Sequence, residues 1–158
     1  MHKIIIFIMA LILAGTLACQ KEVDIAAEEE AIKSVLQKQL EAVSALDYEG
    51  EAEVWAHEPY IVHRTVGIVG WDSLSTYYKT NFREIREKLK EDPEYWTVRE
   101  LRASNFDIHL NGNVAFVFYD EHYDYTLEGK ESSGVSKVLK YLEKKEGEWK
   151  IVAVLPGR

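Results

Sequence analysis

The spacing of apolar residues is helical in the part of the chain that precedes Pro93. One stripe contains Ile32, Val35, Leu36, Leu40, Val43 and Leu46. A second stripe contains Leu74, Tyr78, Phe82, Ile85 and Leu89. We expect Asp47 to cap a shorter helix between these two and Asp72 to cap the third, which Pro93 ends. The pattern predicts three helices.

After Pro93 the apolar residues alternate with a period of two, as Phe106, Ile108 and Leu110 do. The segment "NGN" is a strong hairpin signal, and "EGK" and "EGE" separate the further strands. A short β segment, "YIVHRTVGIVG", comes before the third helix. We expect an α+β domain in which the N-terminal helices pack in the concave face of a strongly curved antiparallel sheet. Such a sheet wrapped round a helix forms a cone with a pocket between them.

The N-terminus reads "MHKIIIFIMALILAGTLAC", in which the apolar run from Ile4 to Leu13 is too short to span a bilayer. The end of this segment is similar to the lipobox of bacterial lipoproteins, because Ala18 precedes Cys19, the only cysteine. We predict a signal peptide over residues 1–18, a tether over 19–27 and a folded domain over 28–158. Lipid on Cys19 would anchor the protein in the bacterial cell envelope, on the periplasmic or outer-membrane side. The alternatives are a plain signal peptide or an uncut N-terminal anchor.

The chain is acidic, with 19 Lys and Arg against 27 Asp and Glu. Loss of residues 1–18 removes Lys3 and leaves 18 against 27, a net charge of −9. This charge argues against nucleic acid and anionic lipid surfaces as partners. The sequence contains no phosphate loop, dinucleotide fingerprint or Ser–His–Asp grouping, and we therefore expect no cofactor.

Four segments carry a resemblance to the nuclear transport factor 2-like superfamily, which includes ketosteroid isomerases and SnoaL-like polyketide cyclases. They are "SALDYEGEAEVWA", "GIVGWDSLSTYY", "NGNVAFVFYDEHY" and "KKEGEWKIVAV". The resemblance implies the cystatin-like cone fold and no single function. It places the isomerase base at Arg64 or His63, the oxyanion aspartate at Leu139 and the first-helix tyrosine at Gln39. None of these residues suits that reaction, so steroid isomerase activity is not expected.

The same resemblance implies which residues of "AFVFYDEHYDY" face the pocket, namely Phe116, Phe118, Asp120 and His122. A histidine between two aspartates has its charged form favoured, which suits a proton-transfer pair of His122 and Asp120. The alternatives are a polar pocket wall without a catalytic role and a strand end that runs out into water. If Phe116, Phe118, Asp120 and His122 face the pocket, the tyrosines of the opposite face lie on the convex side. A second copy packs against this side in the superfamily, and we therefore expect a homodimer.

The complete set of residues that we expect around the pocket is Trp55, Tyr60, His63, Arg64, Tyr78, Phe82, Phe116, Phe118, Asp120 and His122. A metal site made by His57, His63, His122 and Asp120 is an alternative that the spacing does not require, and we expect none. The leading hypothesis is a lipoprotein that binds a small, partly apolar ligand. The alternatives are an enzyme of the isomerase, cyclase or dehydratase type that uses His122 and Asp120, and a structural or partner-binding module with a filled cone.

Overall fold

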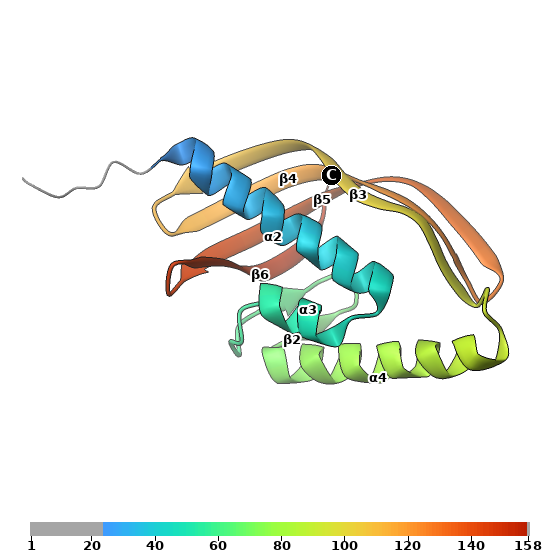
Figure 1. Ribbon diagram of the computed structural model, residues 1–158. Helices are drawn as coiled ribbons and strands as arrows, with labels where there is room; N and C mark the ends of the chain where they lie inside the picture. Colours follow the sequence, from blue (N-terminus) through green and yellow to red (C-terminus); the bar gives the residue numbers. More distant parts are fainter. Residues whose placement is uncertain (1–23, 158) are drawn as a thin grey trace, which may run out of the picture.

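A computed structural model of the protein describes residues 24–157, and within this range the chain forms three helices (Figure 1). They are α2 (Ile25–Ala45), α3 (Tyr48–Val54) and α4 (Trp71–Glu91). The predicted signal peptide and Cys19 lie outside the described residues, and residues 25–27 of the predicted tether are helical. No helix in this range is long and apolar enough to cross a membrane.

Polar side chains cap the first two helices. Asp24 accepts a hydrogen bond from the backbone N–H of Ala27, and Asp47 accepts one from the N–H of Glu49. The prediction for the third helix was wrong in one detail. Gly70 is the N-cap of α4, and Asp72 lies in its first turn. A carboxylate there interacts favourably with the positive end of the helix dipole.

The described strands form one six-stranded sheet in the order β2-β1-β6-β5-β4-β3. The strands are β1 (Val62–His63), β2 (Ile68–Val69), β3 (Trp96–Asn111), β4 (Val114–Leu127), β5 (Lys130–Lys145) and β6 (Glu148–Pro156). All pairings are antiparallel except that of β1 with β6, so the sheet is mixed and not purely antiparallel as expected. The α+β prediction is confirmed.

The long strands β3 to β5 curve around the helices (Figure 1). The register of β3 on β4 shifts between Val98 and Glu100 and again between Ser104 and Asp107. Such irregularities bend a strand and increase its twist. The turns after β4 and β5 are both Glu-Gly pairs with positive φ at both residues, as a two-residue type I′ hairpin requires.

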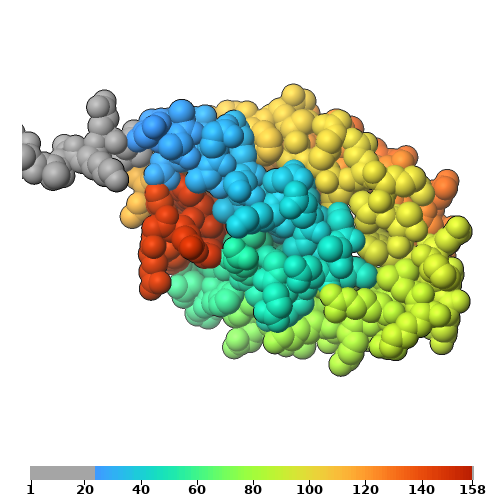
Figure 2. All heavy atoms as spheres, in the orientation of Figure 1, coloured from blue at the N-terminus to red at the C-terminus, as the bar shows by residue number. Residues whose placement is uncertain are grey.

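The core lies between the helices and the concave face of the sheet. Ile32 and Leu36 of α2 and Leu74 of α4 are fully buried, which confirms the predicted helical stripes. Burial of each such side chain contributes about 1.5–3 kcal/mol. In Figure 2, α2 (blue to cyan) covers the face of the sheet beside β3 (yellow).

The two faces of β4 are the reverse of the prediction. Ala115 and Val117 are fully buried with Ile32 of α2, whereas Phe116 and Phe118 are 47% and 44% exposed on the convex face. The first half of β4 is apolar on both faces, so alternation could not decide which face is inside. The smaller side chains pack in the core, and the phenylalanines lie outside.

Candidate functional site

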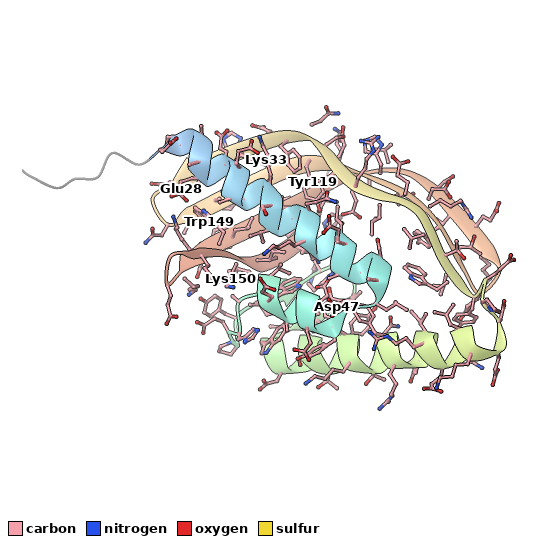
Figure 3. The ribbon with its side chains drawn as sticks, viewed as in Figure 1. Glu28, Lys33, Asp47, Tyr119, Trp149 and Lys150 are labelled. Carbon is pink, nitrogen blue, oxygen red and sulfur yellow. The ribbon has the colours of Figure 1, made fainter. Side chains whose placement is uncertain are left out.

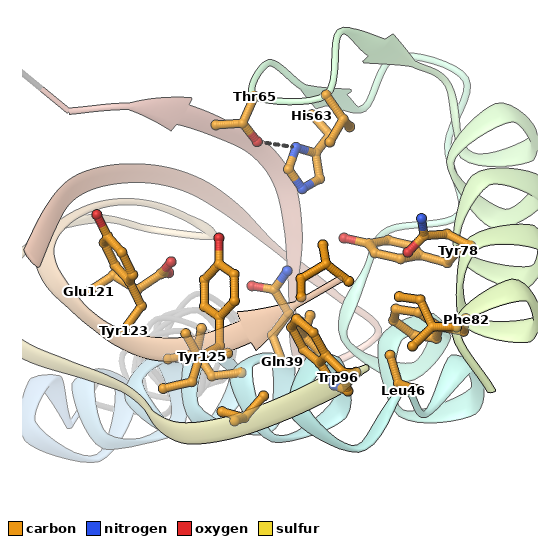
Figure 4. Close-up of a pocket in the computed structure, with 18 of the residues that line it drawn as sticks. Gln39, Leu46, His63, Thr65, Tyr78, Phe82, Trp96, Glu121, Tyr123 and Tyr125 are labelled. Atoms are coloured by element: carbon orange, nitrogen blue, oxygen red, sulfur yellow. Dashed lines mark hydrogen bonds between the residues drawn. The ribbon is translucent and has the colours of Figure 1, made fainter. Parts of the chain in front are cut away.

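A cavity of about 1140 Å³ opens between α4, the C-terminal half of α2 and the curved parts of β3, β4 and β5 (Figure 4). Its position follows from the curvature of the sheet, which separates the strand ends from α2. One end of the cavity is polar and the other is aromatic. The polar end contains Gln39, His63, Tyr78 and Lys140, and the aromatic end contains Trp96, Tyr123 and Tyr125. Phe82 and Glu121 lie where the two ends meet, with Phe82 beside Tyr78 and Glu121 beside Tyr123.

Lys140 of β5 lies at the polar end and is only 2% exposed. Its Nζ donates a hydrogen bond to Oε1 of Gln39 on α2 and lies 5.3 Å from the centroid of the Tyr119 ring. No carboxylate of the described residues forms an ion pair with it. Burial lowers the pKa of Lys140, because a desolvated amine loses the hydration that favours its charge.

Glu51 of α3 lies behind this end of the cavity and is fully buried. Its Oε2 accepts a hydrogen bond of 2.8 Å from the indole N–H of Trp55, while its Oε1 has no partner among the described residues. Burial raises the pKa of Glu51, although the hydrogen bond from Trp55 and the charge of Lys140 oppose the increase. Such a carboxyl can change its protonation near neutral pH.

His63 and Tyr78 form the adjacent wall (Figure 4). The Nδ1 atom of His63 lies 2.8 Å from Oγ1 of Thr65, and its ring stacks on Trp55 with the centroids 5.6 Å apart. Burial, followed by the charge of Lys140, lowers the pKa of His63 to about 4, so the ring is neutral at physiological pH. Burial also raises the pKa of the Tyr78 hydroxyl well above its usual range.

Aromatic rings from β3 and β4 line the other end. The rings of Trp96 and Tyr125 lie 5.4 Å apart, and those of Tyr125 and Tyr123 lie 6.0 Å apart. The indole N–H of Trp96 donates to the carbonyl oxygen of Ser44, which fixes the ring relative to α2. Because the indole N–H of Trp96 is already hydrogen-bonded, these rigid aromatic faces are suited to contact a flat or apolar ligand.

Three of the ten residues predicted around the pocket line this cavity, namely His63, Tyr78 and Phe82. Trp55 is a buried core residue that orients Glu51. Tyr60 is exposed, and its hydroxyl lies within hydrogen-bonding distance of Glu143 and Lys145, outside the cavity.

The other predicted residues belong to the outer surface. Phe118, Asp120 and Arg64 line a second, smaller pocket of about 650 Å³ there, and Phe116 does not line it. Hydrogen bonds from Asn105 and Lys137, at 2.8 and 2.9 Å, lower the pKa of Asp120. Nε2 of His122 lies 2.8 Å from Oγ of Ser104 on β3. The prediction that His122 and Asp120 face the pocket as a proton-transfer pair was therefore wrong, because it rested on the reversed faces of β4.

The sequence reasoning missed most of the polar end. Gln39 and Lys140 were the usable signals, because each is a polar residue at a position where the surrounding pattern places an apolar one. The family resemblance also pointed to Gln39 and to Leu139, which is one residue away from Lys140. Glu51 gave no such signal, since it belongs to the acidic segment "YEGEAEV".

The described residues contain no group of three or more His, Cys, Asp and Glu side chains that could hold a metal ion. His57 is stacked on Trp71 with the ring centroids 4.1 Å apart, and His63 lies at the cavity. His122 is on the opposite face of the sheet. The side chains considered for a metal site are therefore not brought together.

Comparison with known proteins agrees with this architecture. A family model of the SnoaL-like domain matches residues 32–154. No functionally curated protein matches the chain. A nuclear transport factor 2-like superfamily protein from Salmonella enterica is 18% identical, covers 84% of this chain and 94% of its own, and superposes with a TM-score of 0.65.

Two further solved structures have the same fold. An NTF2-like protein from Cytophaga hutchinsonii is 16% identical over 80% of this chain and 93% of its own, with a TM-score of 0.58. An NTF2-like protein with a cystatin-like fold from Novosphingobium aromaticivorans is 15% identical over 87% and 89%, with a TM-score of 0.57. These structural likenesses carry the fold alone. The match to the family model shows that the chain belongs to the SnoaL-like family, and the solved structures show that it has the NTF2-like fold.

Proposed function

We propose that this domain binds a small molecule with an apolar, ring-containing body and one polar end. The observation that carries the proposal is the open cavity of about 1140 Å³ with chemically different ends. Small-molecule sites are concave and mostly apolar, and a few polar groups in them fix the orientation of the ligand. The open cavity also argues against a structural module with a filled cone.

The two ends of the cavity suggest one orientation for the ligand. Its body lies against Trp96, Tyr123 and Tyr125, and its polar group points towards Lys140 and Tyr78. Lys140 and Tyr78 can both donate hydrogen bonds, so an oxygen that accepts hydrogen bonds is the polar group that fits best. A polar group without such an acceptor would leave the buried donors with fewer partners.

Binding is tested with 2-naphthalenemethanol, which has an aromatic body and one hydroxyl. Ser136 on β5 lines the cavity, whereas Ser133 on the same strand is exposed and faces outward. Ser136→Trp fills part of the cavity, and Ser133→Trp adds the same side chain outside. We expect saturable binding to the wild-type protein by isothermal titration calorimetry, with at least tenfold weaker binding to Ser136→Trp.

Ser133→Trp is the matched control and should bind the alcohol as the wild-type protein does. Equal loss of affinity in both variants would show that the alcohol does not bind in this cavity. The absence of saturable binding to the wild-type protein would contradict a ring-containing ligand. The thermal unfolding temperatures of the three proteins show whether a loss of affinity comes from a filled cavity, which leaves the fold intact, or from a disturbed fold.

We further propose that the convex face of the sheet pairs with a second copy of the chain. Phe116 and Phe118 are exposed there, two positions apart on β4, and the half-buried Tyr141 lies beside Phe116 with the ring centroids 5.0 Å apart. A contiguous apolar surface of this kind is typical of an interface. Sedimentation velocity should give a dimer for the wild-type protein and a monomer for Phe118→Asp. A monomeric wild-type protein at micromolar concentration would contradict the pairing.

The lipid anchor is proposed from the sequence alone. Ala18 and Cys19 end an apolar leader, and the cysteine is at the position that lipidation requires. We expect the full-length protein to be recovered with membranes, and Cys19→Ser to release it into the soluble fraction of the envelope. Metabolic labelling with a tagged fatty acid should mark the wild-type chain only. Equal labelling of both chains would contradict attachment at Cys19.

A further inference from the structure

Lys140 is an unusual lysine, because it is buried and no ion pair with a described residue accounts for its burial. It also lines the cavity in which the ligand is proposed to bind. We propose that the Lys140 amine condenses reversibly with an aldehyde or ketone of the ligand to form an imine. This inference rests on the proposed function, since it names the chemical class of the ligand's polar end.

The surroundings of Nζ favour an amine that acts as a nucleophile. Gln39 Oε1 accepts one hydrogen bond from Nζ and so holds the side chain in place, while a neutral amine keeps its lone pair for a carbonyl carbon. The ring of Tyr119, which is on the adjacent strand β4, has its centroid 5.3 Å from Nζ of Lys140. An ordinary structural lysine would instead be expected to reach water or a carboxylate.

The charged and titratable groups around Lys140 come from four elements: Glu51 of α3, His63 of β1, Tyr78 of α4, and Tyr119 and Glu121 of β4. Desolvation is the largest influence and lowers the pKa of Lys140, while the charges of Glu121 and Glu51 partly oppose it. A lysine desolvated in this way has a larger fraction of free amine near neutral pH, which is the reactive form.

The proposed reaction needs no oxidant or reductant. The lone pair of Nζ forms a bond to the carbonyl carbon, and the π electrons of the carbonyl move to its oxygen. The nitrogen gives up two protons in all, and both end on that oxygen, which leaves as water when the C=N bond forms. The nearby Glu51 carboxyl, whose pKa is raised by burial, can exchange protons near pH 7.

The imine is tested by trapping it in the wild-type protein with sodium cyanoborohydride. Acetaldehyde, benzaldehyde and 2-naphthaldehyde serve as probes, and peptide mapping by mass spectrometry gives the labelling rate of each lysine. Lys145 is the internal control, because it is on the same strand and its Nζ is held by Glu143 and Tyr60 at 2.8 and 2.7 Å, outside the cavity. These contacts raise the pKa of Lys145 and keep the amine protonated.

We expect Lys140 to be labelled at least tenfold faster than Lys145 by at least one of the three aldehydes. The rate should rise with pH through a midpoint below that of the exposed lysines, which a purely structural role of Lys140 would not produce. Lys140 labelling no faster than Lys145 with all three probes would overturn the inference. Binding of 2-naphthalenemethanol, measured on the same protein, reports on the proposed function separately, since an alcohol cannot form an imine. If the alcohol binds but the aldehydes do not label Lys140 selectively, the imine proposal is overturned and the proposed function is not.

Discussion

The two faces of β4 carry similar residue types in different surroundings. On the inner face, the Tyr119 hydroxyl donates to Glu121 at 2.9 Å beside the buried Lys140 (Figure 3 shows Tyr119 on the sheet behind α2). On the outer face, Asp120 is bound by Lys137 and Asn105, and His122 by Ser104. Only the inner face adjoins the large cavity. A cluster of ionisable side chains therefore does not by itself indicate the site. The cluster that is buried beside the cavity does.

Desolvation explains why this difference matters for function. Polar groups on the outer face can replace a lost partner with water, whereas those at the inner end of the cavity depend on the protein or on a ligand. The visible signs of that dependence are the Oε1 of Glu51, which has no partner among the described residues, and the buried Lys140, whose Nζ donates its hydrogen bond there to an amide oxygen. Groups of this kind are candidates for binding or chemistry.

The largest effect is expected when a single carboxylate is introduced on the inner or on the outer face of β4. Val117→Asp buries a carboxylate where the side chain is fully enclosed, and it should reduce the free energy of unfolding by more than about 4 kcal/mol. Phe118→Asp, at the next position, should cost about 1 kcal/mol or less, because Phe118 is partly exposed already. Urea denaturation at low protein concentration, where dimers do not contribute, measures both. Similar losses would contradict the assignment of the faces.

Much of the fold could be predicted from the sequence, because the helical stripes and the turn residues are local signals. Asp47 was correctly identified as a cap, and the hairpin at Gly112 follows from "NGN". The parallel pairing of β1 with β6 could not be predicted, since these strands are two and nine residues long and far apart in the chain. Pairing between distant short strands depends on tertiary contacts and not on local pattern.

The site was harder to predict, because its location depends on one choice of face. The apolar residues of β4 occupy both faces, and that ambiguity carried Asp120 and His122 into the predicted pocket. Gln39 and Lys140 interrupt apolar patterns, but the sequence does not show that they meet across 101 positions. Residues from α4 were found because Tyr78 and Phe82 belong to a clear helical stripe.

His63 provides a test of burial at the inner end through pH. The pKa of His63 is lowered from the usual 6.5 to about 4, so between these values the unfolded chain takes up a proton that the folded chain does not. Stability is therefore lost as the pH falls from 6.5 to 4, by up to about 3 kcal/mol. His63→Gln cannot ionise, and the difference in unfolding free energy between pH 7 and pH 4 should shrink by about that amount.

Urea denaturation of both proteins at the two pH values measures this difference, and the comparison cancels the contributions of other titrating groups. A variant with the same acid sensitivity as the wild-type protein would mean that water reaches the His63 ring in solution. The polar end of the cavity would then be more hydrated than its enclosure by Trp55 and Tyr78 indicates.

The smallest expected effect concerns the ligand itself. Tyr123 lines the cavity and His122, its neighbour in the chain, does not. Tyr123→Ala removes an aromatic contact worth about 1.4 kcal/mol and should weaken binding of 2-naphthalenemethanol by roughly tenfold. His122→Ala removes only the contact with Ser104 and should leave the affinity within about twofold. If the histidine variant loses more affinity than the tyrosine variant in calorimetric titrations, the ligand binds on the convex face. The cavity would then be a feature of packing, since the face with the exposed phenylalanines would carry the recognition.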